Sequence, residues 1–241
     1  MIFLKKNIKI GIIGALSREI QIIISKLKNY SIKKDKIFTL HMGTINFSKI
    51  AIIKSGIGKV LSSINTLHLI KLFNPDLIIN IGISGSLRKE LLIGDIIISK
   101  KICYHDVDLT YFGYKIGQIP KNPKYYYSPY PLVKILENIS DLIGLNFKSG
   151  LIISGDSFIH CKEKNNLLKI KKFFPHAYAV DMESSSIAQV CNIFCIPFIS
   201  IRSISDCIYE ENKIKFKLNS YLAIKNFSNI TLKFIKNTSL L

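Results

Sequence analysis

Residues 7–14 of the chain read NIKIGIIG, and residues 17–30 read SREIQIIISKLKNY. The first stretch is largely apolar, which is typical of a strand buried inside a sheet. Gly14 and Ala15 then provide a tight turn, and the second stretch repeats apolar residues at helical spacing. Together they predict a strand that leads directly into a helix, which is the basic unit of an α/β fold.

The alternation of strands and helices continues along the chain. Further strands are predicted within residues 36–54, 75–82, 92–105, 148–158, 177–182 and 197–206, and further helices within 56–73, 131–143, 162–174, 183–194 and 212–237. The Tyr-, Pro- and Gly-rich segment 105–130 is predicted to be a long loop, which in a compact domain is usually functional. We therefore expect one α/β domain over residues 1–241, with its core at about 8–237 and helices layered on a central mixed, twisted sheet.

The composition restricts the classes of protein. A hydrophobic content of 48% in 241 residues is enough for a large core and argues against disorder. No apolar run reaches the roughly 18–20 residues that span a bilayer, so we expect a cytoplasmic protein without a membrane partner. The net charge of +18 raises the alternative of a nucleic-acid-binding protein. Only three of the 34 basic residues are arginines and all are scattered. A codon bias toward Lys, Ile and Asn explains this pattern, and no nucleic-acid partner is predicted.

The cysteines and histidines predict neither a disulfide framework nor a metal site. The cysteines are Cys103, Cys161, Cys191, Cys195 and Cys207, an odd number without a CxxC spacing. We interpret them as buried free thiols. The segment YHDVD at 104–108 is interpreted as a solvated loop because a metal would need further ligands. No metal and no cofactor are predicted.

Three carboxylates follow apolar strands, where ligands bind in α/β folds: Glu19, Glu183 and Asp206. A single one could merely complement a helix dipole. Together they suggest a site that needs both a base and an acid, as cleavage of a glycosidic bond does. Asp181 lies two residues before Glu183, at the point where an apolar run gives way to a helical pattern. We expect the segment to separate them, with Asp181 pointing away from the site.

Eight segments resemble those of the 5′-methylthioadenosine/S-adenosylhomocysteine nucleosidases, a branch of the nucleoside phosphorylase-like superfamily. In chain order they are KIGIIGALSREI, IIKSGIGKV, PDLIINIGISGSL, GDIIIS, YHDVDLTYFGYKIGQIP, GLIISGDSFI, FPHAYAVDMESSSIAQVC and IPFISIRSISD, within about residues 8–207. The resemblance implies a nucleoside phosphorylase-like fold. It also implies hydrolysis of the N-glycosidic bond of methylthioadenosine, S-adenosylhomocysteine and 5′-deoxyadenosine, in methionine salvage.

The same resemblance implies roles for individual residues. Glu19 activates the attacking water, and Asp206, supported by Ser205, donates a proton toward N7 of adenine. Glu183 binds the ribose hydroxyls and Met182 packs on the ribose. The other residues implied at the site are Arg202 for the water and carboxylate network, Phe158 and Ile159 for adenine, Ile57, Ile83, Ser84 and Gly85 at the strand ends, Leu109, Phe112 and Tyr114 for the 5′ substituent, and Pro120, which a partner subunit contributes in the family's homodimer.

The chain departs from the family pattern at one position, and two alternative functions remain open. This chain reads NIGISGS where the family usually has NTGSAGG, so Ile83 replaces a serine near the water and ribose. A purine nucleoside phosphorylase of the same superfamily is the nearest alternative, for which Arg18 is a candidate phosphate ligand. Glu19 and the apolar 5′ pocket that the resemblance implies favour hydrolysis. A binding protein without catalysis is disfavoured by the three intact carboxylates.

Overall fold

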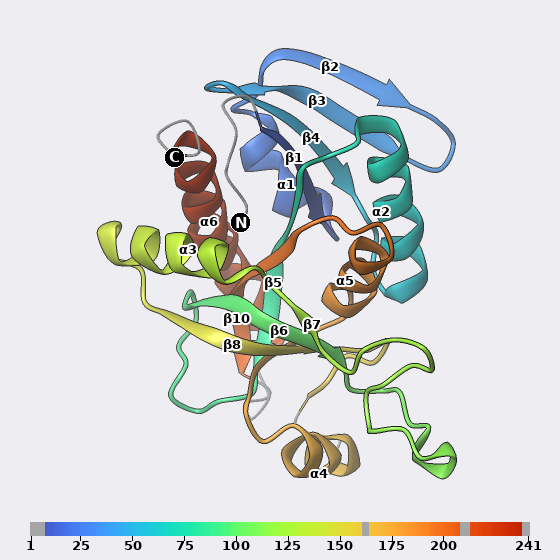
Figure 1. Cartoon of the computed structure of the whole chain (residues 1–241). Coiled ribbons are helices and arrows are strands. Elements are labelled where there is room, and N and C mark those ends of the chain that lie inside the picture. Colours follow the sequence, from blue (N-terminus) through green and yellow to red (C-terminus); the bar gives the residue numbers. More distant parts are fainter. Residues whose placement is uncertain (1–7, 161–163, 208–212, 238–241) are drawn as a thin grey trace.

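The computed structural model describes residues 8–160, 164–207 and 213–237, which form one mixed sheet with helices on both faces (Figure 1). The strands are β1 (Lys9–Gly14), β2 (Lys28–Lys34), β3 (Thr39–Ile45), β4 (Ser48–Lys54), β5 (Leu77–Ser86), β6 (Ile96–Tyr104), β7 (Tyr126–Tyr127), β8 (Phe147–Ser154), β9 (Ala177–Asp181) and β10 (Phe198–Cys207). The helices are α1 (Ser17–Ile24), α2 (Lys59–Phe73), α3 (Tyr130–Leu142), α4 (Lys164–Phe173), α5 (Ser184–Ile193) and α6 (Lys213–Asn237), and Thr110–Phe112 form a short 3-10 helix.

The sheet follows the order β10-β6-β8-β9-β5-β1-β4-β3-β2, and β7 pairs with β6. β10 also pairs with β5, so β5, β10, β6, β8 and β9 close into a ring from which β1, β4, β3 and β2 extend. Strands β1, β4, β5 and β10 run parallel. Their carboxyl ends therefore share one edge, which is where an α/β sheet offers a ligand site.

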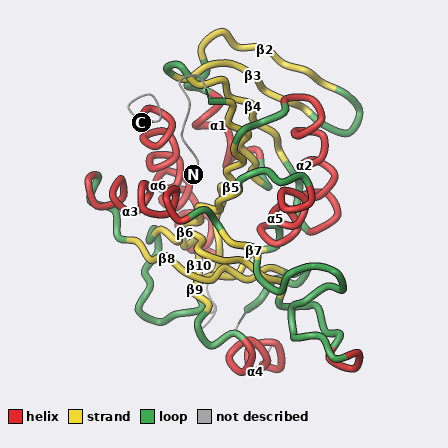
Figure 2. Tube along the Cα trace, viewed as in Figure 1, coloured by secondary structure: helices red, strands yellow, loops and turns green. Residues whose placement is uncertain are grey.

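Two apolar clusters lie on opposite faces of the sheet. Helices α1, α3 and α6 pack on one face, whose core includes Ile23, Leu136 and Phe227. Helices α2 and α5 pack on the other face, whose core includes Leu69 and Ile187. Figure 2 shows these two helical layers with the strands between them. The predicted layered α/β class with a mixed sheet is confirmed.

One local prediction is wrong, and another is incomplete. The helix predicted over 17–30 ends at Ile24, and residues 28–34 form β2, which pairs with β3. Asn29 adopts a left-handed backbone (φ 50°) that a helix does not allow, and pairing with β3 satisfies the backbone of this exposed segment. The segment 105–130 is mainly loop, but it also contains β7 and the 3-10 helix.

The cysteines only partly match their prediction. Cys103 and Cys191 are buried, whereas Cys195 is exposed and Cys207 is partly exposed. Cys195 has a left-handed backbone (φ 54°) in the turn after α5, which carries its side chain to the surface. All four are free thiols, and Cys161 lies outside the described residues.

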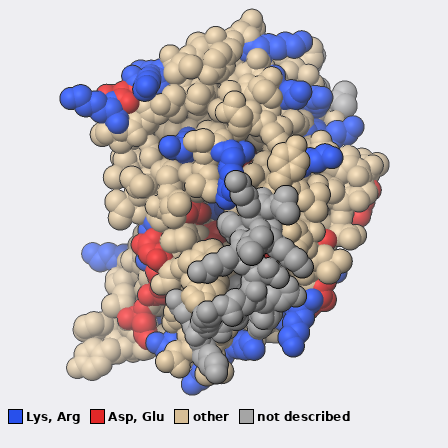
Figure 3. Space-filling model, turned by 180° about the vertical axis from the view of Figure 1, so that it is seen from behind, with Lys and Arg blue, Asp and Glu red and all other residues tan. Residues whose placement is uncertain are grey.

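On the face of the molecule opposite to the one seen in Figure 1, the basic residues do not gather in a single patch. Figure 3 shows separate groups of basic residues there, with neutral surface between them. The expected absence of a nucleic-acid partner stays a prediction. Within the described ranges, no helix is both long enough and apolar enough to cross a membrane.

Candidate active site

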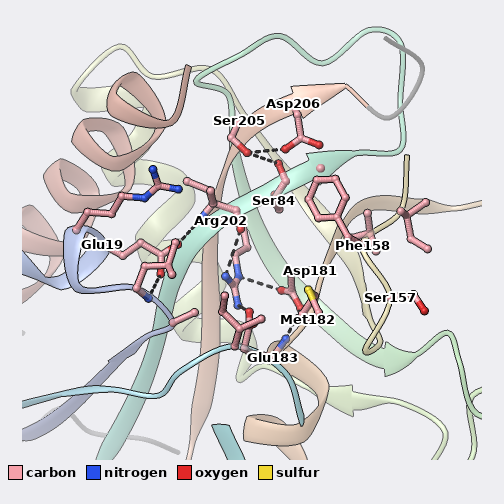
Figure 4. A pocket seen from close by; sticks show the side chains of 18 residues that line it. Glu19, Ser84, Ser157, Phe158, Asp181, Met182, Glu183, Arg202, Ser205 and Asp206 are labelled. Carbon is pink, nitrogen blue, oxygen red and sulfur yellow. Dashed lines mark hydrogen bonds and ion pairs between the residues drawn. The ribbon is translucent and has the colours of Figure 1, made fainter. Parts of the chain in front are cut away.

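A cavity of about 280 Å³ opens at the carboxyl ends of the parallel strands. It is lined by Ala15, Leu16, Arg18, Glu19, Ile57, Ile83, Ser84, Gly85, Ser157, Phe158, Ile159, Val180, Asp181, Met182, Glu183, Arg202, Ser205 and Asp206. Most of the site residues predicted from the sequence are in this set, and they come from segments that are distant in the chain. Figure 4 shows the three predicted carboxylates around this cavity, with Arg202 among them.

Glu19 is almost completely buried in the first turn of α1. One carboxylate oxygen accepts the N–H of Leu16 at 2.8 Å, and the other accepts the N–H of Ile83 at 3.0 Å. The first contact satisfies a free amide at the start of the helix, and the second fixes the carboxylate against β5. Burial raises the pKa of Glu19, although Arg202 and the backbone N–H groups oppose this shift. Glu19 is thus a fixed carboxylate with increased basicity.

Arg202 lies at the centre of the site and is fully buried on β10. Its Nε donates to Asp181 Oδ2 at 2.9 Å, and its Nη2 lies 3.7 Å from Glu183 Oε2. Nη2 also donates to the hydroxyl of Ser184 at 3.1 Å. A buried guanidinium needs such partners, because an unpaired buried charge is very costly. Arg202 therefore connects the β9–α5 turn to the strand that carries Asp206.

Asp181 does not point away from the site, so that prediction is wrong. Besides binding Arg202, its carboxylate accepts the N–H groups of Glu183 (3.1 Å) and Ser184 (3.0 Å) and the hydroxyl of Ser154 (2.6 Å). β9 ends at Asp181 and α5 begins at Ser184, so the carboxylate is in place to accept N–H groups at the start of the helix. Asp181 thus holds the start of α5 and the guanidinium together.

Glu183 precedes α5 and is buried. Its Oε1 accepts the N–H of Gly58 at 3.1 Å. Burial raises the pKa of Glu183 to about 7, Arg202 opposes the shift, and the neighbouring Asp181 adds to it. Glu183 thus carries less negative charge near neutral pH than an exposed glutamate.

Asp206 lies near the end of β10, where the pairing with β5 is irregular. Ile204 pairs with Ser84 and Asp206 with Gly85, so Ser205 is the extra residue of a bulge. The bulge interrupts the alternation of side chains, and Ser205 and Asp206 both line the cavity. The Ser205 hydroxyl donates to Asp206 Oδ1 at 2.6 Å. Burial raises the pKa of Asp206, and the hydrogen bond from Ser205 lowers it by less. The net rise favours the protonated form of Asp206.

The rest of the cavity wall is largely apolar. Phe158 is 55% exposed and follows β8, whereas the neighbouring Ile159 is buried. Figure 4 shows the Phe158 ring on the same side as Asp206, across the cavity from Glu19. The Ser84 hydroxyl is buried and has no hydrogen-bond partner among the described residues.

Four predicted site residues do not line this cavity: Leu109, Phe112, Tyr114 and Pro120. They lie in the long segment between β6 and β7, where Phe112 is 70% exposed and Pro120 is exposed. Their participation in the 5′ pocket stays a prediction.

The sequence alone also missed Gly82. A Cβ atom at this position would lie 2.2 Å from Arg202 Nη1 and 3.0 Å from Glu19 Oε1. Only glycine therefore lets both side chains lie against β5. Arg18, the candidate phosphate ligand, is exposed and lines the cavity from the first turn of α1. Within the described part of the chain, no group of three His, Cys, Asp or Glu side chains could hold a metal ion.

Comparison with known proteins agrees with this geometry. The model of the phosphorylase superfamily matches residues 9–236. A 5′-methylthioadenosine/S-adenosylhomocysteine nucleosidase of Buchnera aphidicola subsp. Baizongia pistaciae is 45% identical over 97% of this chain and 92% of its own length.

Two solved structures have the same fold over nearly their whole length. The nucleosidase of Colwellia psychrerythraea, in complex with adenine, is 35% identical, with a TM-score of 0.90 and 96% of both chains covered. The enzyme of Neisseria meningitidis, in complex with methylthio-immucillin-A, is 33% identical, with a TM-score of 0.91 over 95% of this chain and 99% of its own. The chain belongs to the phosphorylase superfamily and, within it, to the 5′-methylthioadenosine/S-adenosylhomocysteine nucleosidases.

Proposed function

We propose that the protein hydrolyses the N-glycosidic bond of methylthioadenosine and S-adenosylhomocysteine, and releases adenine and the 5′-substituted ribose. 5′-Deoxyadenosine, which carries the same bond, is included as a substrate. The observation that carries the proposal is the arrangement of Glu19, Glu183 and Asp206 around one cavity with an aromatic wall. The named relatives and the complex of one of them with adenine support it.

Asp206 is the proposed acid. Adenine leaves poorly as an anion, so a proton must reach the base as the bond breaks. Burial keeps the pKa of Asp206 raised, so a protonated carboxyl group persists to higher pH than in water. Its position beside the Phe158 ring suits proton donation toward N7 of a purine that stacks on this ring.

Glu19 is the proposed base. Its two backbone hydrogen bonds hold the carboxylate in one orientation, and its raised pKa increases its affinity for a proton from water. Attack on the ribose carbon from the side opposite to adenine requires base and acid on different sides of the sugar. The separation of Glu19 and Asp206 across the cavity fits this requirement.

The charge of the site favours the transition state. The ribose becomes positively charged as the glycosidic bond breaks. Glu19, Asp181 and Glu183 lie around one buried guanidinium, that of Arg202, so the carboxyl groups there outnumber the buried cation. Fixed negative groups stabilise a developing cation in a site that excludes water. Glu183 is also the proposed partner of the ribose hydroxyls, and Met182 the apolar contact of the ring.

We further propose that the protein works as a homodimer, with the outer face of α2 in the interface. Besides Leu69 and Ile70, the helix buries the polar residues Ser62, Asn65 and Thr66, and it exposes the apolar residues Val60, Leu61, Ile64 and Leu67. Such an exposed apolar face is typical of a surface that another chain covers. The partner would bring Pro120 to the open side of the cavity, where Leu109, Phe112 and Tyr114 are proposed to complete the 5′ pocket.

The proposed setting is methionine salvage in the cytoplasm. An exposed free thiol, Cys195, suits a reducing compartment.

Adenine release tests the proposed reaction. The protein is incubated with methylthioadenosine with and without inorganic phosphate, and adenine is measured by chromatography. Equal rates in both samples are expected for a hydrolase. Release of adenine only when phosphate is present would make the protein a phosphorylase, with Arg18 as the first candidate for a phosphate ligand.

A further inference from the structure

We propose that Lys59, Asp106 and Asp156 form a positioning cluster, called here the clamp, that holds the cavity-lining segment 157–159 in place. The proposal rests on the proposed function, because this segment carries Phe158, the proposed stacking partner of adenine. None of the three clamp residues lines the cavity. They are therefore positioning residues that act through the segment rather than on the substrate.

The clamp joins three turns that are far apart in the sequence. Lys59 starts α2, Asp106 follows β6, and Asp156 follows β8. The ammonium of Lys59 donates to Asp106 Oδ2 at 2.7 Å and lies 3.8 Å from Asp156 Oδ2. Asp106 Oδ2 also accepts the backbone N–H of Asp156 at 2.9 Å. One carboxylate oxygen thus connects the side chain of the first turn to the backbone of the third.

Two consecutive N–H groups at the start of α2 connect the clamp to the proposed ribose site. Gly58 donates to Glu183 Oε1 at 3.1 Å, and Lys59 donates to Asp156 Oδ1 at 2.8 Å. The carboxylate that binds ribose and the residue that precedes the adenine wall are therefore held by neighbouring amides. A shift of segment 157–159 would change the distance between the two halves of the substrate site.

The turns pack so closely that a displacement of one turn must displace its neighbours. A Cβ atom on Gly58 would lie 2.9 Å from Asp156 Oδ1, and one on Gly155 would lie 2.5 Å from His105 Nε2 and 2.8 Å from the Asp106 carboxyl carbon. Gly58 also has a positive φ of 87°, which other residues rarely adopt. Both glycines therefore permit close approach of the turns.

The helix itself does not explain the place of Lys59. A cation in the first turn of a helix opposes the helix dipole, so the helix alone would favour another residue. Partial burial raises the pKa of Asp106, but the hydrogen bond from Lys59 and the N–H of Asp156 outweigh it and lower the pKa. Asp106 therefore stays ionised at neutral pH and keeps its attraction for Lys59.

The clamp predicts a salt effect on substrate binding. Its side chains are partly exposed, 28% for Lys59 and 22% for Asp106, so dissolved ions weaken the pair. Methylthioadenosine is uncharged at neutral pH, so salt has little direct effect on its binding. KM of the wild type should therefore rise with ionic strength, while kcat changes little.

The test uses the full chain with Lys59→Met, and Lys59→Arg as the conservative variant. At low salt, Lys59→Met should raise KM for methylthioadenosine about 2- to 5-fold with little change in kcat, and should remove the salt dependence of KM. Lys59→Arg keeps the charge and should restore most of the affinity. Lys134→Met is the matched control, because Lys134 pairs with Glu137 at 2.6 Å in α3 outside the cavity lining.

Hydrogen exchange of the Asp156 amide gives a second readout that needs no activity. The exchange should be faster in Lys59→Met than in the wild type, and unchanged in Lys134→Met. An unchanged exchange rate together with an unchanged KM refutes the clamp, as does an equal effect of both variants. If Lys59→Met does not fold, Asp106→Asn serves in the same assays. Absence of any wild-type turnover would refute the proposed function instead. The hydrogen-exchange rate of the Asp156 amide would then still show whether the clamp exists.

Discussion

Replacement of Gly82 by alanine tests how tightly the site depends on β5. The added Cβ would lie 2.2 Å from Arg202 Nη1, whereas ordinary contacts begin at 3.4 Å, so the guanidinium must retreat by about 1.2 Å. Arg202 is fully buried and lies 2.9 Å from Asp181, so a shift of this size would disturb that buried ion pair. Disruption of a buried ion pair costs about 3–5 kcal/mol.

The expected result for Gly82→Ala has two parts. The free energy of unfolding should fall by about 3 kcal/mol or more, measured by urea denaturation. Because Glu19 Oε1 also lies 3.0 Å from the new Cβ, kcat/KM for methylthioadenosine should fall about 100-fold in the folded enzyme.

Gly11→Ala is the matched control for overpacking. Its Cβ would lie 2.8 Å from a methyl group of Leu69, on the α2 side of the sheet. It should cost about 1–3 kcal/mol of stability and leave kcat/KM of the folded enzyme unchanged. Wild-type turnover in Gly82→Ala, or an equal loss of turnover in both variants, refutes the reasoning.

Three further predictions concern acid, base, charge and assembly. Asp206→Asn and Glu19→Gln should each lower kcat by about 10²–10⁴-fold. Both variants should still bind a non-hydrolysable nucleoside analogue in calorimetry. Near wild-type turnover in either variant would mean that the role of the replaced residue is misassigned. Burial raises the pKa of Glu183 from 4.5 to about 7, so protonated Glu183 stabilises the fold. This stabilisation is complete below pH 4.5 and is lost as the pH rises through about 7, by at most about 3 kcal/mol. The unfolding free energy of Glu183→Gln, measured by denaturation across this pH range, should lack this loss. An identical pH dependence in the variant and the wild type would contradict the prediction. Val60→Asp with Leu67→Asp on α2 should convert a dimer into monomers in analytical ultracentrifugation, and a wild-type monomer would exclude the dimer.

The strand and helix order could be predicted because each buried element has its own local pattern. The apolar runs of β1 and β5 and the helical spacing of α3 are visible without tertiary information. β2 could not be predicted, because the polar segment KNYSIKK becomes a strand only by pairing with β3. Closure of the ring through the β10–β5 pair also depends on contacts that are distant in sequence.

The candidate site was predictable where a carboxylate lies at or shortly after the carboxyl end of an apolar strand. Glu19, Glu183 and Asp206 met this criterion, and all three line one cavity. The position of Asp181 was predicted wrongly because its carboxylate is held by Arg202 from another strand and by the first N–H groups of α5, contacts that the local sequence does not show. The role of Gly82 could not be predicted either, since it depends on the approach of Arg202 from another strand.

The source of the new oxygen on the sugar tests the central claim most directly. Hydrolysis transfers an oxygen from water to the C1′ atom of the ribose, so turnover of methylthioadenosine in water enriched in oxygen-18 should label the released sugar. The label is measured by mass spectrometry at early times, before the sugar exchanges this oxygen with water, with and without phosphate. We expect the same labelling rate in both samples, and about 10²–10⁴-fold slower labelling with Glu19→Gln. An unlabelled sugar 1-phosphate, formed only when phosphate is present, would contradict the account.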